Sequence, residues 1–162
     1  MIDFIKWRGD LSYGVSPPCE IDALIFAQFS YLHFRDALGE RSASLTEAAR
    51  AVEKLPREPG GPQATADRHA LLKAARASAR FGRLTVGHCE DLFVPFRNMQ
   101  FAAVTFSLPD GSHMLAYRGT DATVVGWRED FNMASDCPVP SQTEALRYLE
   151  EVAAATTGAL RL

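Results

Sequence analysis

Leu115 to Phe131 read LAYRGTDATVVGWREDF, and Met114 to Tyr117, which overlap the start of this region, are apolar on both faces of a strand. A strand that is apolar on both faces is typical of a sheet that is covered on both sides. We therefore predict a strand over Ser112–Arg118 in the interior of an α/β sheet.

Two more strands are predicted before this one. Arg83–His88 and Met99–Leu108 are rich in β-branched and aromatic residues with a period of two. Pro109-Asp110-Gly111 is a tight-turn sequence that joins the second of these strands to Ser112–Arg118. The sequence thus predicts a β-hairpin.

The region before the hairpin predicts helices. The stretch Ile21–Phe34 follows Pro17-Pro18 and places apolar residues at helical spacing. These apolar residues are Ile21, Leu24, Ile25, Phe29 and Leu32. We predict one helix over this stretch, packed on the core, and we predict that residues 1–20 are irregular.

Ser44 and Glu47 have the spacing of a capping box, in which each side chain accepts a hydrogen bond from the other residue's backbone amide. This motif predicts a helix from Ser44 to about Leu55. Residues 56–64 contain Pro59-Gly60-Gly61-Pro62 and are predicted to be irregular.

A further helix is predicted over roughly Ala64–Arg80, and it carries a basic stripe into the residues that follow. The stripe consists of His69, Lys73, Arg76, Arg80 and Arg83. We interpret it as the solvated face of an amphipathic helix, and phosphate binding is the alternative.

The carboxyl-terminal segment predicts a helix and a strand. Ser141 and Glu144 suggest a second capping box, and Leu146, Leu149, Val152 and Ala153 would form the buried face. Gly158 would end the helix, and Ala159–Leu162 would begin a strand parallel to Ser112–Arg118. The fold class is therefore α/β, with amino-terminal helices, a β-hairpin and a strand-helix-strand unit.

Composition limits the classes of partner. The 162 residues contain 47% apolar residues, which is enough for one compact domain over residues 1–162. A net charge of −3 favours neither nucleic acid nor an anionic membrane. The longest apolar-rich stretch is too short to span a bilayer, and no motif implies a cofactor.

The three cysteines, Cys19, Cys89 and Cys137, are widely spaced and odd in number. This pattern argues for structural thiols in a reducing compartment. The first thirteen residues lack a signal-peptide core. We therefore expect a cytoplasmic protein.

The segment Leu115–Thr120, followed by Gly126-Trp127 and Asp130-Phe131, resembles the F-R-G-[ST] segment and the following W-x-x-D of class 3 lipases. A bacterial branch of lipase-like α/β-hydrolases, filed mostly as a domain of unknown function, is more similar still. Its characteristic segments correspond to Ile21–Leu32, Gln100–Phe106 and Arg118–Met133. This second resemblance covers most of the chain and implies an incomplete α/β-hydrolase-type sheet.

The resemblance also implies residue roles. Thr120 matches the family's oxyanion-hole donor, and Gly119 would let substrate approach closely. Trp127 and Asp130 match positions that would brace this loop. Arg118 and Asp121 are interpreted as members of a structural ion pair or of loop hydrogen bonds in the same supporting loop.

No nucleophile can be assigned. The α/β-hydrolase nucleophile lies in a G-x-S-x-G motif, and the 162 residues contain none. The sequence is expected to end before this motif, the acid and the histidine. Ser107, Ser112 and Ser135 lack the motif's context, and the four histidines lack the spacing of a zinc site or an assignable triad.

Two function classes remain open. In the first, the chain is the amino-terminal part of a lipase- or esterase-like serine hydrolase, which would act on an acyl ester only if a second segment supplied the missing groups. In the second, the chain is a non-enzymatic remnant or interaction module that associates with itself or with a partner chain through an exposed sheet edge.

Overall fold

The computed structural model describes residues 1–56, 62–119 and 124–162, and it combines helices with a mixed five-stranded sheet in the order β1-β2-β3-β4-β5. The strands are β1 (Ala43–Ser44), β2 (Thr85–Val94), β3 (Met99–Ser107), β4 (His113–Tyr117) and β5 (Leu160–Arg161). The helices are α1 (Ile2–Arg8), α2 (Glu20–Phe29), α3 (Phe34–Leu38), α4 (Leu45–Val52), α5 (Pro62–Arg76), the 3₁₀ helix η1 (Pro95–Arg97), α6 (Val124–Asn132) and α7 (Pro140–Ala155).

The predicted hairpin is confirmed as the antiparallel pair β3–β4. Gly111 has φ +80° in the connecting turn, a conformation that glycine adopts without steric cost. The side chain of Asp110 accepts hydrogen bonds from the backbone amide and the hydroxyl of Ser112, at 2.9 and 2.6 Å. These bonds close the turn and align His113 with Ser107.

The last strand, β5, pairs with β4 in parallel, with His113 opposite Leu160 and Met114 opposite Arg161. This confirms the predicted strand-helix-strand unit. In the described sheet β5 is an edge strand of two residues, and it lies inside Ala159–Leu162, the segment that we predicted would begin a strand.

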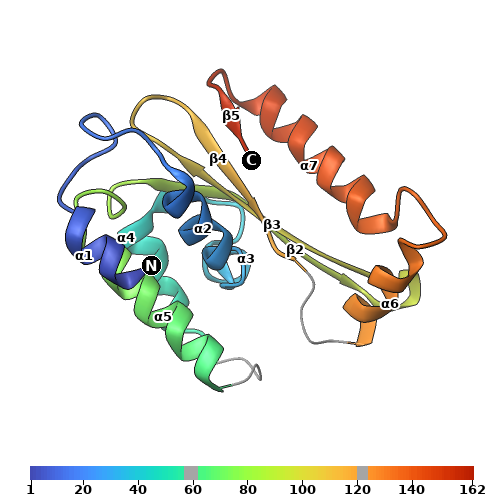
Figure 1. Ribbon diagram of the computed structural model, residues 1–162. Helices are drawn as coiled ribbons and strands as arrows, with labels where there is room; N and C mark the ends of the chain where they lie inside the picture. The colour runs from blue at the N-terminus through green and yellow to red at the C-terminus, as the bar shows by residue number, and fades with distance from the viewer. Residues whose placement is uncertain (57–61, 120–123) are drawn as a thin grey trace.

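The two faces of the sheet are covered by different helices (Figure 1). On one face, Phe26 and Phe29 of α2 pack against Phe106 of β3, with ring centroids 4.6 and 6.1 Å apart. On the other face, Tyr148 and Val152 of α7 pack with Phe101 and Leu115. Strand β4, which lies between β3 and β5, is buried from both sides, as its apolar sequence predicted.

Strand β2 is longer than the predicted Arg83–His88 because it continues through an irregularity. Its register with β3 shifts between Gly87 and Glu90, and His88 there has φ +46°. A bulge bends a strand and re-aims its side chains. The second half of β2 then runs to Val94 and carries Asp91 toward the end of β4.

The predicted helix over Ile21–Phe34 is wrong in its second half, because the chain turns between α2 and α3. The Ser30 hydroxyl donates to the Ala27 carbonyl at 2.8 Å, and the Tyr31 amide bonds to Gln28 O at 3.4 Å instead of continuing the helical pattern. A serine that bonds back to its own helix competes with further helical bonding. Its buried face also differs from the prediction, because Ile21 and Leu24 are exposed and Asp22 is buried.

Residues 1–20 are not wholly irregular as predicted, since α1 occupies Ile2–Arg8. Its buried Ile5 joins the main core, so packing stabilises a helix that the sequence pattern did not indicate. In the predicted irregular segment 56–64, residues 57–61 lie outside the described residues, and α5 already begins at Pro62.

The capping box of Ser44 and Glu47 is confirmed. The Ser44 hydroxyl accepts from the Glu47 amide at 3.2 Å, and the Glu47 carboxylate accepts from the Ser44 amide at 3.1 Å. The helix that follows, α4, ends at Val52 rather than at about Leu55.

The second predicted capping box, Ser141 with Glu144, is wrong. Helix α7 begins at Pro140, and the Gln142 side chain accepts a hydrogen bond from the Val139 amide at 3.0 Å. Proline suits the first helical position because it has no amide hydrogen to satisfy there. On the predicted buried face, Val152 is buried but Leu146 and Ala153 are exposed, since Tyr148 occupies the sheet side instead.

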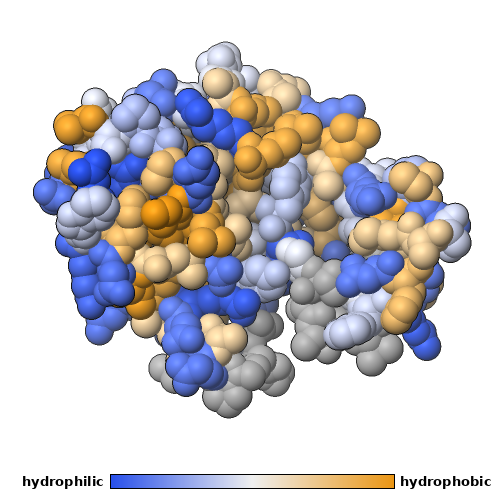
Figure 2. All heavy atoms as spheres, viewed as in Figure 1, coloured by the Kyte–Doolittle hydropathy of each residue, from blue (hydrophilic) through white to orange (hydrophobic). Residues whose placement is uncertain are grey.

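Apolar side chains also reach the surface. Figure 2 shows them over α1 and α2 and, across the molecule, around α7 and β5. The large exposed apolar residues of these elements include Trp7, Leu24, Leu146 and Leu162. No helix in the described ranges has the length and apolar character needed to cross a bilayer.

Candidate functional site at the end of strand β4

Two of the residues singled out by the sequence lie at the carboxyl end of β4. Arg118 and Gly119 directly follow this strand, whereas Thr120 and Asp121 lie outside the described residues. Trp127 and Asp130 are on α6, and both are exposed, Trp127 by 58%. So large an exposure of the indole is more than a purely bracing role would predict.

Arg118 forms an ion pair with Asp91 of β2. Its two terminal nitrogens donate to the two carboxylate oxygens at 3.1 and 2.8 Å, a bidentate geometry. The Arg118 side chain is 9% exposed and that of Asp91 is 23% exposed. Arg118 is therefore held by an ion pair to β2, a strand distant in sequence from its own loop.

Asp91 also lies near a histidine from the helical face. The Nδ1 atom of His33 is 3.6 Å from an Asp91 carboxylate oxygen and 3.4 Å from one of Asp36. The connection between α2 and α3 thus contacts β2 beside the end of β4. Nothing in the sequence pattern indicated that Asp91 would take part in this cluster.

The same α2–α3 connection places Tyr31 against Gly119. A Cβ atom built on Gly119 would lie 3.2 Å from the Tyr31 hydroxyl oxygen. A side chain at position 119 would therefore crowd this hydroxyl, and the Tyr31 side chain would have to shift by a few tenths of an ångström. Sequence reasoning missed Tyr31, although it lies inside the Ile21–Leu32 segment that carries the family resemblance.

A cavity of about 190 Å³ opens next to Gly119 on the α7 side of the sheet. Gly126 of α6 and the first turn of α7 contribute to its wall. The polar and small residues around it include Gln100, Tyr117, Ser141 and Gln142. Backbone groups at the end of β4 are therefore accessible to a small ligand.

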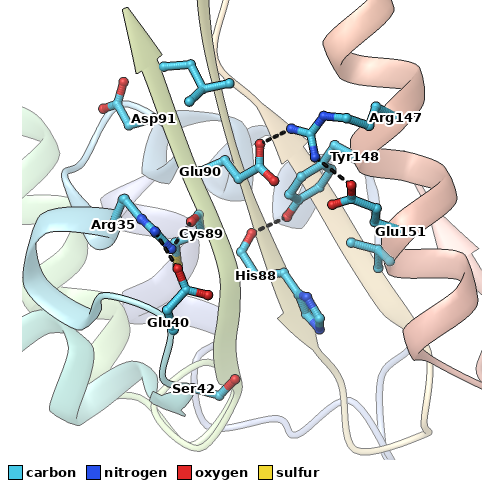
Figure 3. A pocket seen from close by; sticks show the side chains of 12 residues that line it. Arg35, Glu40, Ser42, His88, Cys89, Glu90, Asp91, Arg147, Tyr148 and Glu151 are labelled. Atoms are coloured by element: carbon cyan, nitrogen blue, oxygen red, sulfur yellow. Dashed lines mark hydrogen bonds and ion pairs between the residues drawn. The ribbon is translucent and has the colours of Figure 1, made fainter.

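A second, larger cavity of about 470 Å³ lies beside the bulge of β2 (Figure 3). Arg147 of α7 crosses its wall and donates to Glu90 at 2.5 Å, to Glu144 at 2.7 Å and to Glu151 at 2.8 Å. Hydrogen bonds to these carboxylates raise the pKa of the Arg147 guanidinium, and the bond to Glu90 has the largest effect. The positive charge of Arg147 at this cavity is thus already paired with carboxylates.

The other groups at this cavity are also structural. The Tyr148 hydroxyl donates to the His88 carbonyl at 2.6 Å and lies 2.7 Å from the Thr105 hydroxyl, so it ties α7 to the bulge. Burial raises the pKa of the Cys89 thiol to about 12, so a nucleophilic thiolate is disfavoured there. We therefore place the candidate site at Gly119 and not at this cavity.

One serine and one histidine do come together, which the sequence did not indicate. The Ser107 hydroxyl and His113 Nδ1 are 2.9 Å apart, as a cross-strand pair at the opposite end of β4 from Gly119. Among the described residues no carboxylate orients this imidazole, so the pair lacks the third member of a triad. The described part of the chain also contains no group of three His, Cys, Asp or Glu residues that could hold a metal ion.

Comparison with known proteins identifies the family. The model of the Mbeg1-like family, a family of domains of unknown function, matches residues 75–162. The match includes β2 to β5 and both helices that follow β4. No curated protein and no solved structure matches the chain. Because the family model covers more than half of the sequence, this chain belongs to the Mbeg1-like family.

Proposed function

We propose that the chain forms the amino-terminal part of a lipase- or esterase-type serine hydrolase with an α/β-hydrolase sheet, and that Gly119 and Thr120 form half of its oxyanion hole. The observation that carries this proposal is the relation of β4 to β5. The two strands are parallel neighbours, so their carboxyl ends lie at the same end of the sheet. Gly119 lies at this end, directly after β4. In open α/β sheets, ligands bind at the carboxyl ends of the strands.

The chemistry needs hydrogen-bond donors at the carboxyl ends of these strands. When a serine oxygen adds to an ester carbonyl, the carbonyl oxygen becomes an oxyanion that donors in the cleft stabilise. Thr120 would donate from its backbone amide and its hydroxyl, and Gly119 would leave room for the substrate. The second backbone donor would come from the residue after the nucleophile.

The serine, the acid and the catalytic histidine would have to come from a segment with a G-x-S-x-G motif, which the 162 residues lack. We therefore expect that the purified 162-residue chain does not hydrolyse short-chain nitrophenyl esters above a heat-killed control. Turnover that survives repurification and disappears on mutation of a serine in this chain would contradict this expectation.

The oxyanion role is tested in an active full-length relative or a complemented assembly. Thr120→Val should lower kcat by about 100-fold, the lower end of the usual loss for one oxyanion donor, because the backbone amide remains. The matched control is Thr157→Val, the same substitution at an exposed threonine far from the site. Its neighbour Gly158 lies against the turn at the opposite end of β4. Full turnover in Thr120→Val would reduce the Arg118–Asp121 segment to a structural turn.

An interaction module is the second candidate, and the edge position of β5 favours it. Only one side of this strand is paired in the described sheet, and Leu162 beside it is 74% exposed. Such an edge can pair with another chain. The coding sequence after codon 162 distinguishes the two candidates, since a G-x-S-x-G motif there favours the hydrolase and unrelated sequence favours the module.

A further inference from the structure

We propose that the Tyr31 hydroxyl is an additional hydrogen-bond donor to the substrate's carbonyl oxygen at Gly119. This inference rests on the proposed function, which it deepens by naming a side chain that would contact the reacting group. It rests on three observations: the fixed position of the Tyr31 ring, the lack of a hydrogen bond from its hydroxyl to any of the described residues, and the closeness of this hydroxyl to Gly119.

The position of Tyr31 is set by the turn that ends α2. Ser30 and Leu32 on either side of it are buried, at 4% and 8% exposure. The Leu32 amide bonds to Phe29 O at 2.9 Å, which closes the turn. Tyr31 is therefore held at the sheet end of α2 by its neighbours.

The ring of Tyr31 is held by Arg68 of α5. The Arg68 guanidinium carbon lies 4.1 Å from the ring centroid, and Arg68 Nε donates to the Gln28 side chain at 3.4 Å. A guanidinium stacked on an aromatic face is attracted by the ring's quadrupole. The stacked Arg68 guanidinium thus holds the Tyr31 ring in place, and the Tyr31 hydroxyl is not needed to fix the ring.

The hydroxyl of Tyr31 differs from those of the other three tyrosines. Tyr13 donates to Asp22, Tyr117 donates to the Ala145 carbonyl, and Tyr148 donates to the His88 carbonyl. For Tyr31, no hydrogen bond of the hydroxyl is found in the described part of the chain. The residue is only partly buried.

The contact with Gly119 places this donor at the proposed site. The hydroxyl oxygen lies 3.2 Å from where a Cβ of residue 119 would be. An oxygen atom bound in front of the Gly119 backbone would lie within reach of the same hydroxyl. Two donors from separate elements, the α2–α3 connection and the loop after β4, would then converge on one oxygen.

In the reaction, the histidine of the complementing segment takes the proton of that segment's serine hydroxyl as the serine oxygen bonds to the carbonyl carbon, and the carbonyl π pair moves onto the carbonyl oxygen. The Tyr31 hydroxyl donates a hydrogen bond to this oxyanion and keeps its proton. When the intermediate collapses, the pair returns to re-form the carbonyl, and the alkoxide leaves with a proton from the histidine of that segment. Tyr31 thus stabilises charge without being consumed.

Binding is the first test, because it needs no nucleophile. The probe is n-butylphosphonate, a tetrahedral anion with a short alkyl chain, titrated into the ¹⁵N-labelled 162-residue chain while the Gly119 amide shift is followed. Tyr31→Phe keeps the ring on Arg68 but removes the donor. It should weaken binding by about 10-fold or more, the ratio expected for loss of a hydrogen bond to a charged group.

Tyr13→Phe is the matched control. Tyr13 also has an arginine, Arg80, 4.1 Å from its ring centroid, but its hydroxyl faces Asp22 in the core. This variant should bind the phosphonate as the wild type does. Circular dichroism of both variants establishes that they are folded.

The outcomes separate the two proposals. Binding that perturbs Gly119 equally in wild type and Tyr31→Phe would overturn the role of Tyr31 and leave the acyl site standing. A wild-type Gly119 amide that does not respond to the phosphonate would overturn the acyl site and the role of Tyr31 with it.

In an active assembly, Tyr31→Phe should lower kcat by about 10- to 100-fold with little change in KM. An unchanged kcat there would also overturn the role of Tyr31.

Discussion

Two arginine–aspartate pairs among the described residues, one in the helical layer and one at the candidate site, differ in how deeply they are buried. Arg80 donates to Asp22 at 2.8 and 2.5 Å, and Arg118 donates to Asp91 at 3.1 and 2.8 Å. The geometries are similar, but the surroundings are not. The side chains of the first pair are 1% and 0% exposed, and those of the second are 9% and 23% exposed.

Arg80 also uses its remaining donors. Its terminal nitrogens donate to the carbonyls of Leu11, Ser16 and Pro17 at 3.0 to 3.1 Å. All five N–H groups of this guanidinium therefore have acceptors. The Arg118 guanidinium makes only its two bonds to Asp91 among the described residues. The first pair locks the segment before α2 in place, and the second aligns two strand ends at a partly open site.

This comparison corrects the interpretation of the basic stripe. Arg80 lies beyond α5, which ends at Arg76, and it is buried rather than part of a solvated face. Arg76 pairs with Glu53 at 2.8 Å. Arg83 is exposed, as the solvated-face interpretation required.

The largest expected effect is from breaking the enclosed pair. Arg80→Ala should lower the free energy of unfolding by about 3–5 kcal/mol, because Asp22 would remain buried without its partner. Urea denaturation at pH 7 measures this change.

Arg83→Ala, an exposed member of the same predicted stripe, is the control and should change stability by less than about 0.5 kcal/mol. Arg80→Lys, with three donors for five acceptors, should fall between them. Equal stability of Arg80→Ala and Arg83→Ala would contradict this account.

Breaking the second pair should cost less. Arg118→Ala should lower the free energy of unfolding by about 1–3 kcal/mol, because water can solvate the partly exposed Asp91 carboxylate that remains. The measurement is again urea denaturation, with the exposed Arg97→Ala as the control. A loss as large as that of Arg80→Ala would show that the two pairs do not differ as their exposure indicates.

The smallest effect is the pH dependence of the enclosed pair. Burial alone would raise the pKa of Asp22, but hydrogen bonds from Arg80 and the Cys19 amide outweigh it and hold this pKa below the usual 3.8. The unfolded chain therefore takes up this proton at a higher pH than the folded chain. The stability that Asp22 contributes is present above about pH 4 and declines as the pH falls below 3.8.

Carbon-13 NMR of the Asp22 carboxyl group should give a titration midpoint below 3.8. In urea denaturation at pH 5 and pH 3, an Asp22→Asn variant should lose less stability on acidification than the wild type does. A midpoint above 3.8, or the same acid sensitivity in both proteins, would mean that burial dominates over the hydrogen bonds.

Much of the fold follows from patterns that involve neighbouring residues only. The turn at Gly111, the capping box at Ser44 and the doubly apolar strand β4 are each set by side chains a few residues apart. The parallel pairing of β4 with β5 also follows, because a helix between two strands brings the second back in the same direction. The resemblance that drew attention to Gly119 likewise rests on one continuous segment.

The rest required contacts between distant parts of the chain. The Asp22–Arg80 pair joins residues 58 apart in sequence, and a lone aspartate in an apolar helix does not reveal which arginine will meet it. The break after Phe29 was hidden because Leu32 continues the apolar spacing, whereas Ser30 bonds back to Ala27.

The candidate site shows the same division. The sequence alone determined which loop carries the candidate site, because glycine and the residues around it form a local motif. Only the tertiary structure decided that Tyr31 meets Gly119 and that Asp91 meets Arg118, since these contacts depend on where the α2–α3 turn and the β2 bulge direct their side chains. Local periodicity encodes which face of an element is buried, and the partner across the interface is selected by packing of the whole chain.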